Sequence, residues 1–301
     1  MDTVITMELR GPDAAEALSR AEAEIHRLDA LLSIEGSGSE IAALNAGSSQ
    51  FLSPEPLELL EAALTLSEAT DGAFDCTIQP AAALWGWYGD SPAVPDSGEL
   101  AEAMALVGYE GVEISGGAVT FRTDGMGVDL GGIGKGYAAG KLNTLLREAG
   151  ITSGWISLGG NIRTIGAKAG GQPWIIGIAD PDDPAAYRCT VAVSDRAVVT
   201  SGDYQRCFTQ DGRRWHHILD PKTGWPAESA LRSVTIVSSD DTLADGLSTA
   251  LFVMGLEGAL DFWRSGPYDF EAVFLTDGPA YVTEGLADGF TCQTDYEVVY
   301  R

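Results

Sequence analysis

The sequence is poor in basic residues, and this shortage excludes one class of partner. Only 18 of its 301 residues are Lys or Arg, against 44 Asp or Glu, so the formal net charge is −26. Binding to nucleic acid requires a basic face that neutralises phosphates, so we expect no nucleic acid partner. A strongly acidic surface is found both in proteins from salt-rich habitats and in ordinary soluble acidic proteins.

Cysteine and long apolar runs are also scarce. The four cysteines are widely spaced and form no C-x-x-C pair, so neither a zinc site nor a thioredoxin-like motif is indicated. The wide spacing gives no evidence for disulfides. No run of about 18 apolar residues is present, which predicts no integral membrane segment. The N-terminus has the pattern of a strand and not of a signal peptide, which predicts a cytoplasmic protein, or an extracytoplasmic one if a leader has been trimmed.

The stretch from Val128 to Tyr137 (VDLGGIGKGY) is the most distinctive part of the chain. Glycine lets the backbone approach a ligand closely, and a lysine next to a helix N-terminus suits an anion. A Walker A loop is excluded because Gly136 follows Lys135 where Ser or Thr is required, and no βαβ unit supports a Rossmann fingerprint. Two interpretations remain: a site for a diphosphate-bearing ligand, or a glycine-rich turn between a strand and a helix.

The spacing of apolar residues predicts helices and strands that are mixed without regular alternation, which favours an α+β fold. A hydrophobic content of 45% supports a sizeable core, and we expect one domain over residues 1–301. The predicted helices cover residues 18–32, 39–45, 54–71, 99–106, 242–254 and 256–264. Another predicted helix follows the glycine stretch, runs through Leu142, Leu145 and Leu146, and is closed by Gly150. The predicted strands cover residues 3–9, 154–158, 173–179, 188–194, 196–200, 213–219, 231–238, 271–276 and 280–283, with a hairpin over 112–122.

The predicted helix 242–254 carries a candidate metal site. Helical spacing places Asp245 and Thr249 on one face, with Ser248 close by. The opposite face is an apolar stripe of Leu243, Leu247, Leu251 and Met254. A carboxylate beside hydroxyl groups suits a hard cation such as Mg²⁺, whereas the alternative is an ordinary solvated face.

Two of the three histidines are adjacent, at His216 and His217, before the turn residues Asp220 to Gly224. Alternation along a strand would place the two rings on opposite faces, so at most one of them is expected to face a site. Histidine suits proton transfer near neutral pH, although a histidine in a strand is more often structural.

Taken together in chain order, these motifs resemble the FAD:protein FMN transferase (ApbE-like) family. The resemblance extends over nearly the whole chain. It is carried by the ordered blocks Ser39–Ile41 with Asn45, Gly72–Asp75, Leu84–Gly86, Asp129–Tyr137, Leu158–Asn161, Thr200–Tyr204, His217–Gly224 and Ala244–Ala250.

The resemblance implies an α+β fold of mixed helices and largely antiparallel sheets around a deep FAD cleft. It also implies Mg²⁺-dependent transfer of the FMN part of FAD to a Thr or Ser hydroxyl of an acceptor flavoprotein, with release of AMP. Some members of the family instead hydrolyse FAD to FMN and AMP. That pyrophosphatase activity, or a non-catalytic FAD-binding role, is the alternative for this chain.

Individual residues acquire roles from the same resemblance. His217 matches the histidine that assists the acceptor hydroxyl. The metal positions are matched by Asp245, Thr249, Ser248 and the backbone carbonyl of Gly132. The FAD-contacting positions are matched by Met1, Ala73, Phe74, Asp75, Asp129, Lys135 and the backbone of Leu219.

Two positions depart from the family pattern. Asp2 stands where the family has glycine in Met-Gly-Thr, beside the flavin contact at Met1. Glu35 stands where many members carry a tyrosine that stacks on the flavin, so we expect no stacking from this loop.

Overall fold

The computed structural model describes residues 3–36, 38–89 and 91–301, and the chain forms two compact units. The first unit comprises Met1–Leu28, Gly134–Tyr204 and Ser229–Arg301, and the second comprises Asp29–Ile133 and Gln205–Glu228. The α+β class and the largely antiparallel sheets expected from the sequence are confirmed. The single domain over residues 1–301 stays a prediction.

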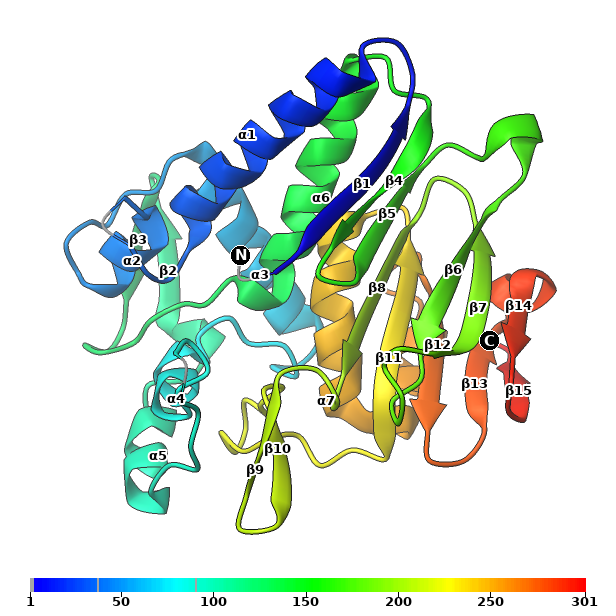
Figure 1. Cartoon of the computed structure of the whole chain (residues 1–301). Coiled ribbons are helices and arrows are strands. Elements are labelled where there is room, and N and C mark those ends of the chain that lie inside the picture. The colour runs from blue at the N-terminus through cyan, green and yellow to red at the C-terminus, as the bar shows by residue number, and fades with distance from the viewer. Residues whose placement is uncertain (1–2, 37, 90) are drawn as a thin grey trace. The chain divides into compact units, whose positions relative to one another are not determined.

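An eight-stranded sheet forms the centre of the first unit, with the order β1-β4-β5-β8-β11-β12-β13-β15 (Figure 1). Every neighbouring pair in it is antiparallel except β13 with β15. A separate sheet has the order β14-β7-β6. The strands are β1 (Ile5–Arg10), β4 (Ser153–Leu158), β5 (Asn161–Ile165), β6 (Trp174–Ala179), β7 (Tyr187–Val193), β8 (Ala197–Gly202), β11 (Leu231–Ser238), β12 (Glu271–Thr276), β13 (Ala280–Thr283), β14 (Phe290–Cys292) and β15 (Tyr296–Val299).

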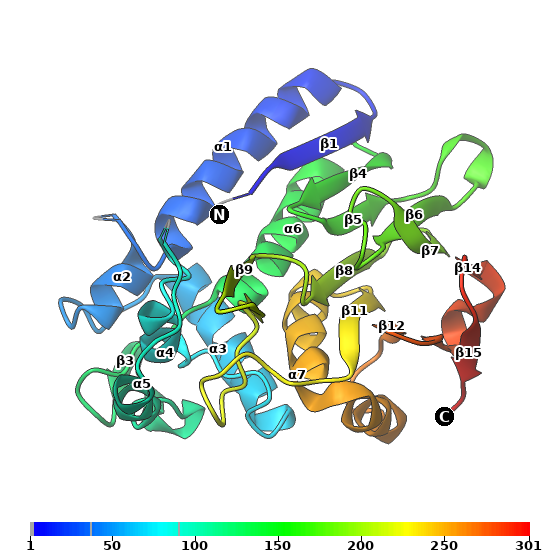
Figure 2. The same ribbon diagram turned by 60° about the horizontal axis from the view of Figure 1, so that its bottom comes forward.

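Both faces of the eight-stranded sheet are covered near its centre. Helix α7 (Asp241–Ser265) packs on β8 and β11, and the three-stranded sheet covers the other face (Figure 2). Strand β11 is therefore buried along nearly its whole length, which explains why its sequence is almost continuously apolar or small. Helices α1 (Ala14–Leu32) and α6 (Gly131–Glu148) also have most of their length in this unit.

Helix α7 contains a break at the position that the sequence indicated. Gly255 has a φ of +73° inside the helix, between the segments predicted as 242–254 and 256–264. Within the described ranges, α7 is the one helix that is long and apolar enough to cross a membrane by composition alone. Its packing against β8 and β11 accounts for that composition, because a buried core helix is equally apolar.

The second unit is built from short helices, two hairpins and a cluster of aromatic rings. Trp85 is fully buried at the centre of the cluster, and its indole N–H donates to the carbonyl oxygen of Gly224 at 2.8 Å. The rings of Trp87, Phe208, Trp215 and Trp225 pack around it with centroid distances of 5.4–6.4 Å. The elements are α2 (Glu40–Asn45), α3 (Pro54–Ala69), α4 (Gln79–Leu84), α5 (Ser97–Met104), β2 (Val112–Ser115), β3 (Ala118–Phe121), β9 (Cys207–Gln210) and β10 (Arg213–His216).

The cysteines show a pairing that their spacing did not predict. Cys189 on β7 and Cys292 on β14 form a disulfide although they are 103 residues apart. They are register partners in adjacent antiparallel strands, and this pairing brings the two sulfur atoms together. Cys76 is buried as a thiol, while Cys207 is exposed.

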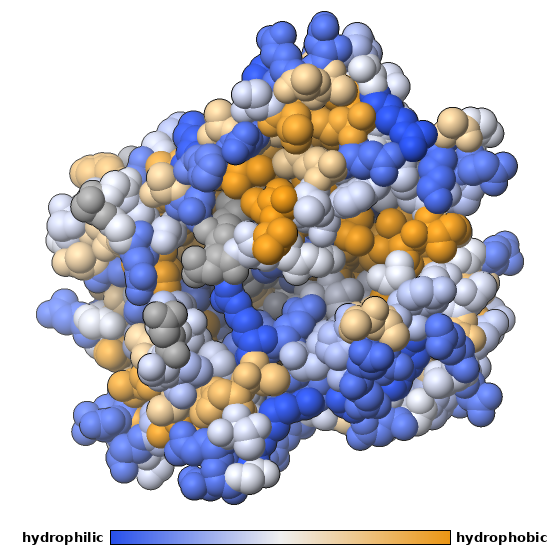
Figure 3. Space-filling model, in the orientation of Figure 1, coloured by the Kyte–Doolittle hydropathy of each residue, from blue (hydrophilic) through white to orange (hydrophobic). Residues whose placement is uncertain are grey.

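Hydrophilic and apolar residues are unevenly distributed on the face of the molecule drawn in Figure 3. The face drawn in Figure 3 is mostly hydrophilic, with apolar residues confined to limited patches.

Candidate active site

Asp245 is surrounded by hydrogen-bond donors in the first unit. Asp245 lies on the second turn of α7, and its side chain is only 4% exposed. Oδ2 accepts the backbone N–H of Gly136 at 2.8 Å, and Oδ1 accepts Nδ2 of Asn161 at 2.7 Å. Nζ of Lys135 is 3.5 Å from Oδ1. A buried carboxylate needs such partners, because burial of an unpaired charge is strongly unfavourable.

Gly136 is required by the close approach of α6 to α7. A Cβ atom at residue 136 would lie 2.7 Å from Cβ of Asp245 and would overlap the carbonyl oxygen of Asp241. Helix α6 begins at Gly131, so Lys135 and Gly136 lie on its second turn and not in a loop before it. At this position the glycine therefore has a packing role, which brings its N–H within reach of Asp245.

One hydroxyl group contacts the backbone of Asp245, and two others are linked to it. Oγ of Ser248 donates to the carbonyl oxygen of Asp245 at 2.8 Å. Oγ of Ser201, on β8, lies 2.8 Å from Oγ of Ser248 and 3.3 Å from Oγ1 of Thr249. The structure thus places the residues predicted on the α7 face together and adds Ser201 from a neighbouring strand.

This set of atoms fits a hard cation. Mg²⁺ prefers oxygen ligands and usually keeps several water molecules, so one carboxylate with hydroxyl and carbonyl oxygens suffices. The ammonium group beside Asp245 shows that the carboxylate attracts positive charge. The parts of the chain that the structure describes contain no cluster of three or more His, Cys, Asp or Glu side chains suited to a metal. A metal at Asp245 would therefore depend on neutral oxygens as well.

Asp129, in the second unit, is held in place just before α6. Its Oδ1 accepts the N–H of Gly131 at 2.7 Å, and its Oδ2 accepts the hydroxyl of Tyr88 at 2.8 Å. Burial and the charge of Asp129 raise the pKa of Tyr88, so the phenol remains a donor. The side-chain amide of Asn45 makes two hydrogen bonds to the backbone of Val128. Its Nδ2 donates to the Val128 carbonyl oxygen, and its Oδ1 accepts the Val128 N–H, each at 2.8 Å. Gly132 follows on the first turn of α6, and its carbonyl as a metal ligand stays a prediction.

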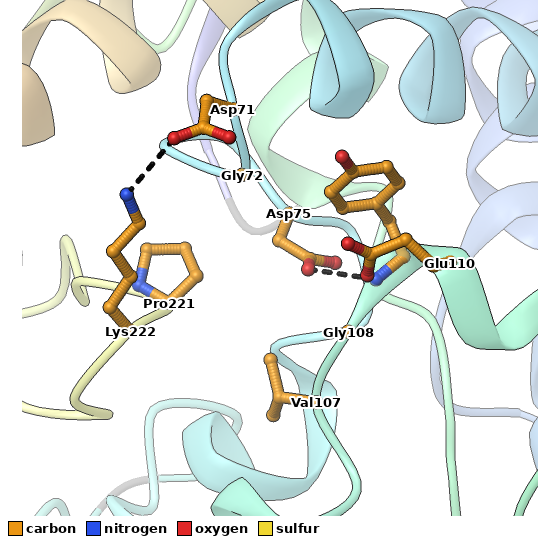
Figure 4. Close-up of a pocket in the computed structure, with 9 residues that line it drawn as sticks. Asp71, Gly72, Asp75, Val107, Gly108, Glu110, Pro221 and Lys222 are labelled. Carbon is orange, nitrogen blue, oxygen red and sulfur yellow. Dashed lines mark hydrogen bonds and ion pairs between the residues drawn. The ribbon is translucent and has the colours of Figure 1, made fainter.

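Asp75 lines a pocket of about 240 Å³ in the second unit (Figure 4). Its Oδ1 accepts the N–H and the hydroxyl of Thr77 at 2.8 and 2.6 Å, and its Oδ2 accepts the N–H of Tyr109 at 3.0 Å. Burial raises the pKa of Asp75 and these hydrogen bonds oppose the rise. Lys222 forms an exposed ion pair with Asp71 at 3.4 Å, also on the pocket wall.

Ala73 and Phe74, which precede Asp75, are buried. Leu219 is also buried, and its backbone pairs with Pro226 in an isolated bridge. Their roles in FAD binding stay predictions.

His216 and His217 contact different segments of the second unit. Nε2 of His216 lies 3.2 Å from the carbonyl oxygen of Ala227, and Nδ1 of His217 lies 3.2 Å from that of Gln205. The predicted strand over 213–219 is wrong at its end, because β10 stops at His216. Since a carbonyl only accepts, this contact assigns the proton of neutral His217 to Nδ1 and the lone pair to Nε2. The ring of Trp87 packs against His217 edge-on at 6.3 Å.

Two predicted residues remain to be placed, and three residues of these sites were not singled out from the sequence. Met1 lies outside the described residues, and Glu35 is exposed. Asn161, Ser201 and Tyr88 received no individual role from the sequence. Asn161 and Ser201 belong to motifs that carried the resemblance, and that membership was the signal that could have identified them.

Comparison with known proteins defines the class to which this fold and these residues belong. The ApbE family model matches residues 1–274. An FAD:protein FMN transferase of Klebsiella pneumoniae (strain 342) is 35% identical over 284 residues, covering 92% of this chain and 87% of that protein. One from Treponema pallidum (strain Nichols) is 36% identical over 292 residues, covering 90% and 80%.

Solved structures agree with the sequence comparison. The ApbE protein of Thermotoga maritima has a TM-score of 0.86 and 32% identity, covering 95% of this chain and 96% of that one. The flavin transferase ApbE of Vibrio cholerae has a TM-score of 0.85 and 28% identity, covering 96% of each chain. The chain therefore belongs to the ApbE family.

Proposed function

We propose that this chain is an enzyme that transfers the FMN part of FAD to a Thr or Ser hydroxyl of an acceptor flavoprotein and releases AMP. The observation that carries the proposal is the group of Asp245 with the hydroxyls of Ser248, Thr249 and Ser201, found in a chain whose relatives are named FAD:protein FMN transferases. The ApbE family model matches residues 1–274, so this group lies within the part of the chain that the family shares.

The proposed reaction is a substitution at phosphorus. The acceptor hydroxyl oxygen forms a bond to the phosphorus of the FMN half, and the bond from that phosphorus to the bridging oxygen breaks. The bridging oxygen leaves with AMP, and the hydroxyl proton passes to Nε2 of His217. A positioned base contributes about 10²–10⁴-fold to such a step, because an alcohol is almost fully protonated at neutral pH. The carbonyl of Gln205 suits His217 to this task by holding its Nδ1–H.

We further propose Mg²⁺ as the cofactor, bound at Asp245. When bound, it would supply positive charge to the diphosphate oxygens. Its other protein ligands would be Ser248, Thr249 and the carbonyl of Gly132. FAD itself would occupy a deep cleft and contact Met1, Ala73, Phe74, Asp75, Asp129, Lys135 and Leu219.

Mass spectrometry of candidate acceptor peptides tests the transfer. Each peptide is incubated with enzyme, FAD and Mg²⁺, beside a matched peptide in which valine replaces the acceptor threonine. We expect the threonine peptide alone to gain the mass of FMN less one water, with one AMP released for each modification. The products of the same reaction without peptide are measured by chromatography.

Other products would identify the alternative functions. Equal amounts of FMN and AMP, with no modified peptide in a broad peptide set, would support an FAD pyrophosphatase that uses water as acceptor. Binding of FAD without any turnover would support a non-catalytic FAD-binding protein.

A further inference from the structure

The buried side chain of Asn161 contacts the carboxylate to which the metal role is assigned. Nδ2 donates to Oδ1 of Asp245 at 2.7 Å, and both residues are only 3% exposed. We propose that Asn161 is a positioning residue, which holds the Asp245 carboxylate in the orientation that binds the cation. This inference rests on the proposed function and adds a residue for which neither the sequence motifs nor the family resemblance supplied a role.

A tight turn places Asn161 with little freedom. Gly159 and Gly160, between β4 and β5, have φ values of +60° and +96°, the combination typical of a type I′ hairpin turn. Leu158 and Asn161 are the residues that close this turn, and they pair directly in the sheet. A Cβ atom at Gly159 would also overlap Oγ1 of Thr3. The turn therefore ties Asn161 to the register of the eight-stranded sheet, and a rigid element of this kind positions a side chain accurately.

The donors around Asp245 differ in how easily they can leave. Gly136 donates from helix backbone, and Asn161 donates from a buried side chain. Lys135 has a side chain that is 31% exposed, and its Nζ is 3.5 Å from Oδ1, beyond the usual range of a strong hydrogen bond. A flexible, strongly hydrated ammonium is thus the group that an arriving dication would displace.

A neutral amide such as that of Asn161 is well suited to orient the Asp245 carboxylate for cation binding. Each carboxylate oxygen can accept two hydrogen bonds or ligands, so Asn161 can stay on Oδ1 of Asp245 while a cation binds the same carboxylate. Because the amide carries no net charge, it orients the oxygen without repelling a dication, as an Arg or Lys in its place would.

The test compares Asn161→Ala with Thr164→Val, a matched control on the same strand. Thr164 is fully buried, and its Oγ1 bonds the backbone carbonyl and N–H of Arg196 at 3.0 and 2.9 Å. Both variants lose a buried polar contact, but only Asn161 touches Asp245. Binding of Mn²⁺ to the metal-free protein is measured by electron paramagnetic resonance, and Mg²⁺ binding by calorimetry. We expect Asn161→Ala to weaken metal binding by about 10–100-fold. Thr164→Val should leave it unchanged, although both variants lower the melting temperature.

A double variant that exchanges the two side chains distinguishes the effect of the hydrogen bond between residues 161 and 245 from the effect of where the carboxylate charge lies. Asn161→Asp combined with Asp245→Asn keeps an amide beside a carboxylate but moves the negative charge to β5. We expect this double variant to fold and to bind neither Mn²⁺ nor Mg²⁺. Metal binding of wild-type strength in the double variant would overturn the positioning role. If Asn161→Ala does not fold, Asn161→Ser replaces it, with the same loss of metal binding expected.

The wild-type measurement distinguishes this inference from the proposed function. A wild-type protein that binds neither Mn²⁺ nor Mg²⁺ would overturn the metal-dependent function itself. Wild-type binding together with unchanged binding by Asn161→Ala would overturn only the role of Asn161.

Discussion

Lys135→Met tests whether the ammonium beside Asp245 is an exchangeable cation. Opposite unit charges 3.5 Å apart attract by about 1 kcal/mol in bulk water and by about 5 kcal/mol at an effective dielectric constant of 20. Because the Lys135 side chain is 31% exposed, the lower end applies, about 1–2 kcal/mol. A cation that binds Asp245 must give up this attraction between Lys135 and the carboxylate. Removal of the ammonium should therefore tighten Mg²⁺ binding by about 5–30-fold in the absence of FAD.

The same substitution should weaken FAD binding. We assign the Lys135 ammonium to the FAD diphosphate, and a hydrogen bond to a charged group contributes about 1.5–3 kcal/mol. FAD affinity should therefore fall by roughly 10–100-fold. The two effects have opposite signs, which a general loss of stability cannot produce.

The assays are calorimetric titration of the metal-free protein with Mg²⁺ and titration of FAD by flavin fluorescence. Lys141→Met is the control, because Lys141 lies further along α6 and its Nζ sits over the Tyr137 ring at 4.7 Å. It should change neither affinity by more than about twofold, which is the size of a surface-charge effect. If Lys135→Met weakens Mg²⁺ binding together with FAD binding, the ammonium does not compete with the cation and the reasoning is wrong.

Three further predictions concern the metal, the base and pH. Removal of metal by a chelator should abolish FMN transfer, and added Mg²⁺ should restore it. The variant Asp245→Ala should remain folded but should be inactive even with Mg²⁺. Full activity of the wild type in the presence of a chelator would contradict this prediction. His217→Ala should lower peptide flavinylation by about 10²–10⁴-fold but should still bind FAD. His216→Ala should keep most of the flavinylation activity. Equal losses of activity in the two variants would indicate that the histidines share a structural role. Burial raises the pKa of Asp241 from 3.8 to about 7 although Arg163 bonds it at 2.9 Å, so the folded state favours the protonated acid. The stability that Asp241 contributes is therefore present below pH 3.8 and lost as pH rises through about 7. We expect urea unfolding to show that the free energy of unfolding of the wild type falls by up to about 4 kcal/mol across this pH range, relative to that of Asp241→Asn. If the difference in free energy of unfolding between the two proteins does not change with pH, the raised pKa of Asp241 is refuted.

The elements predicted well from the sequence are those whose pattern is local. Strands β11, β12 and β13 match the predicted ranges to the residue, because each is a short apolar run between turns. The two predicted segments of α7 meet at Gly255, where the helical spacing is interrupted. Strands β5, β9, β14 and β15 were not predicted, since such short segments become strands through their partners and have little pattern of their own.

The sequence by itself determined that Asp245, Ser248 and Thr249 lie near one another, because positions three and four apart on a helix are neighbours. It did not determine which residues join them. Asn161 is 84 residues from Asp245, and Ser201 is 47 from Ser248, yet each pair is in hydrogen-bond contact. These contacts depend on strand register and on the close packing of helices, which are set by the whole fold. The tertiary structure therefore decided what holds the carboxylate, whereas the local sequence decided that a carboxylate is there.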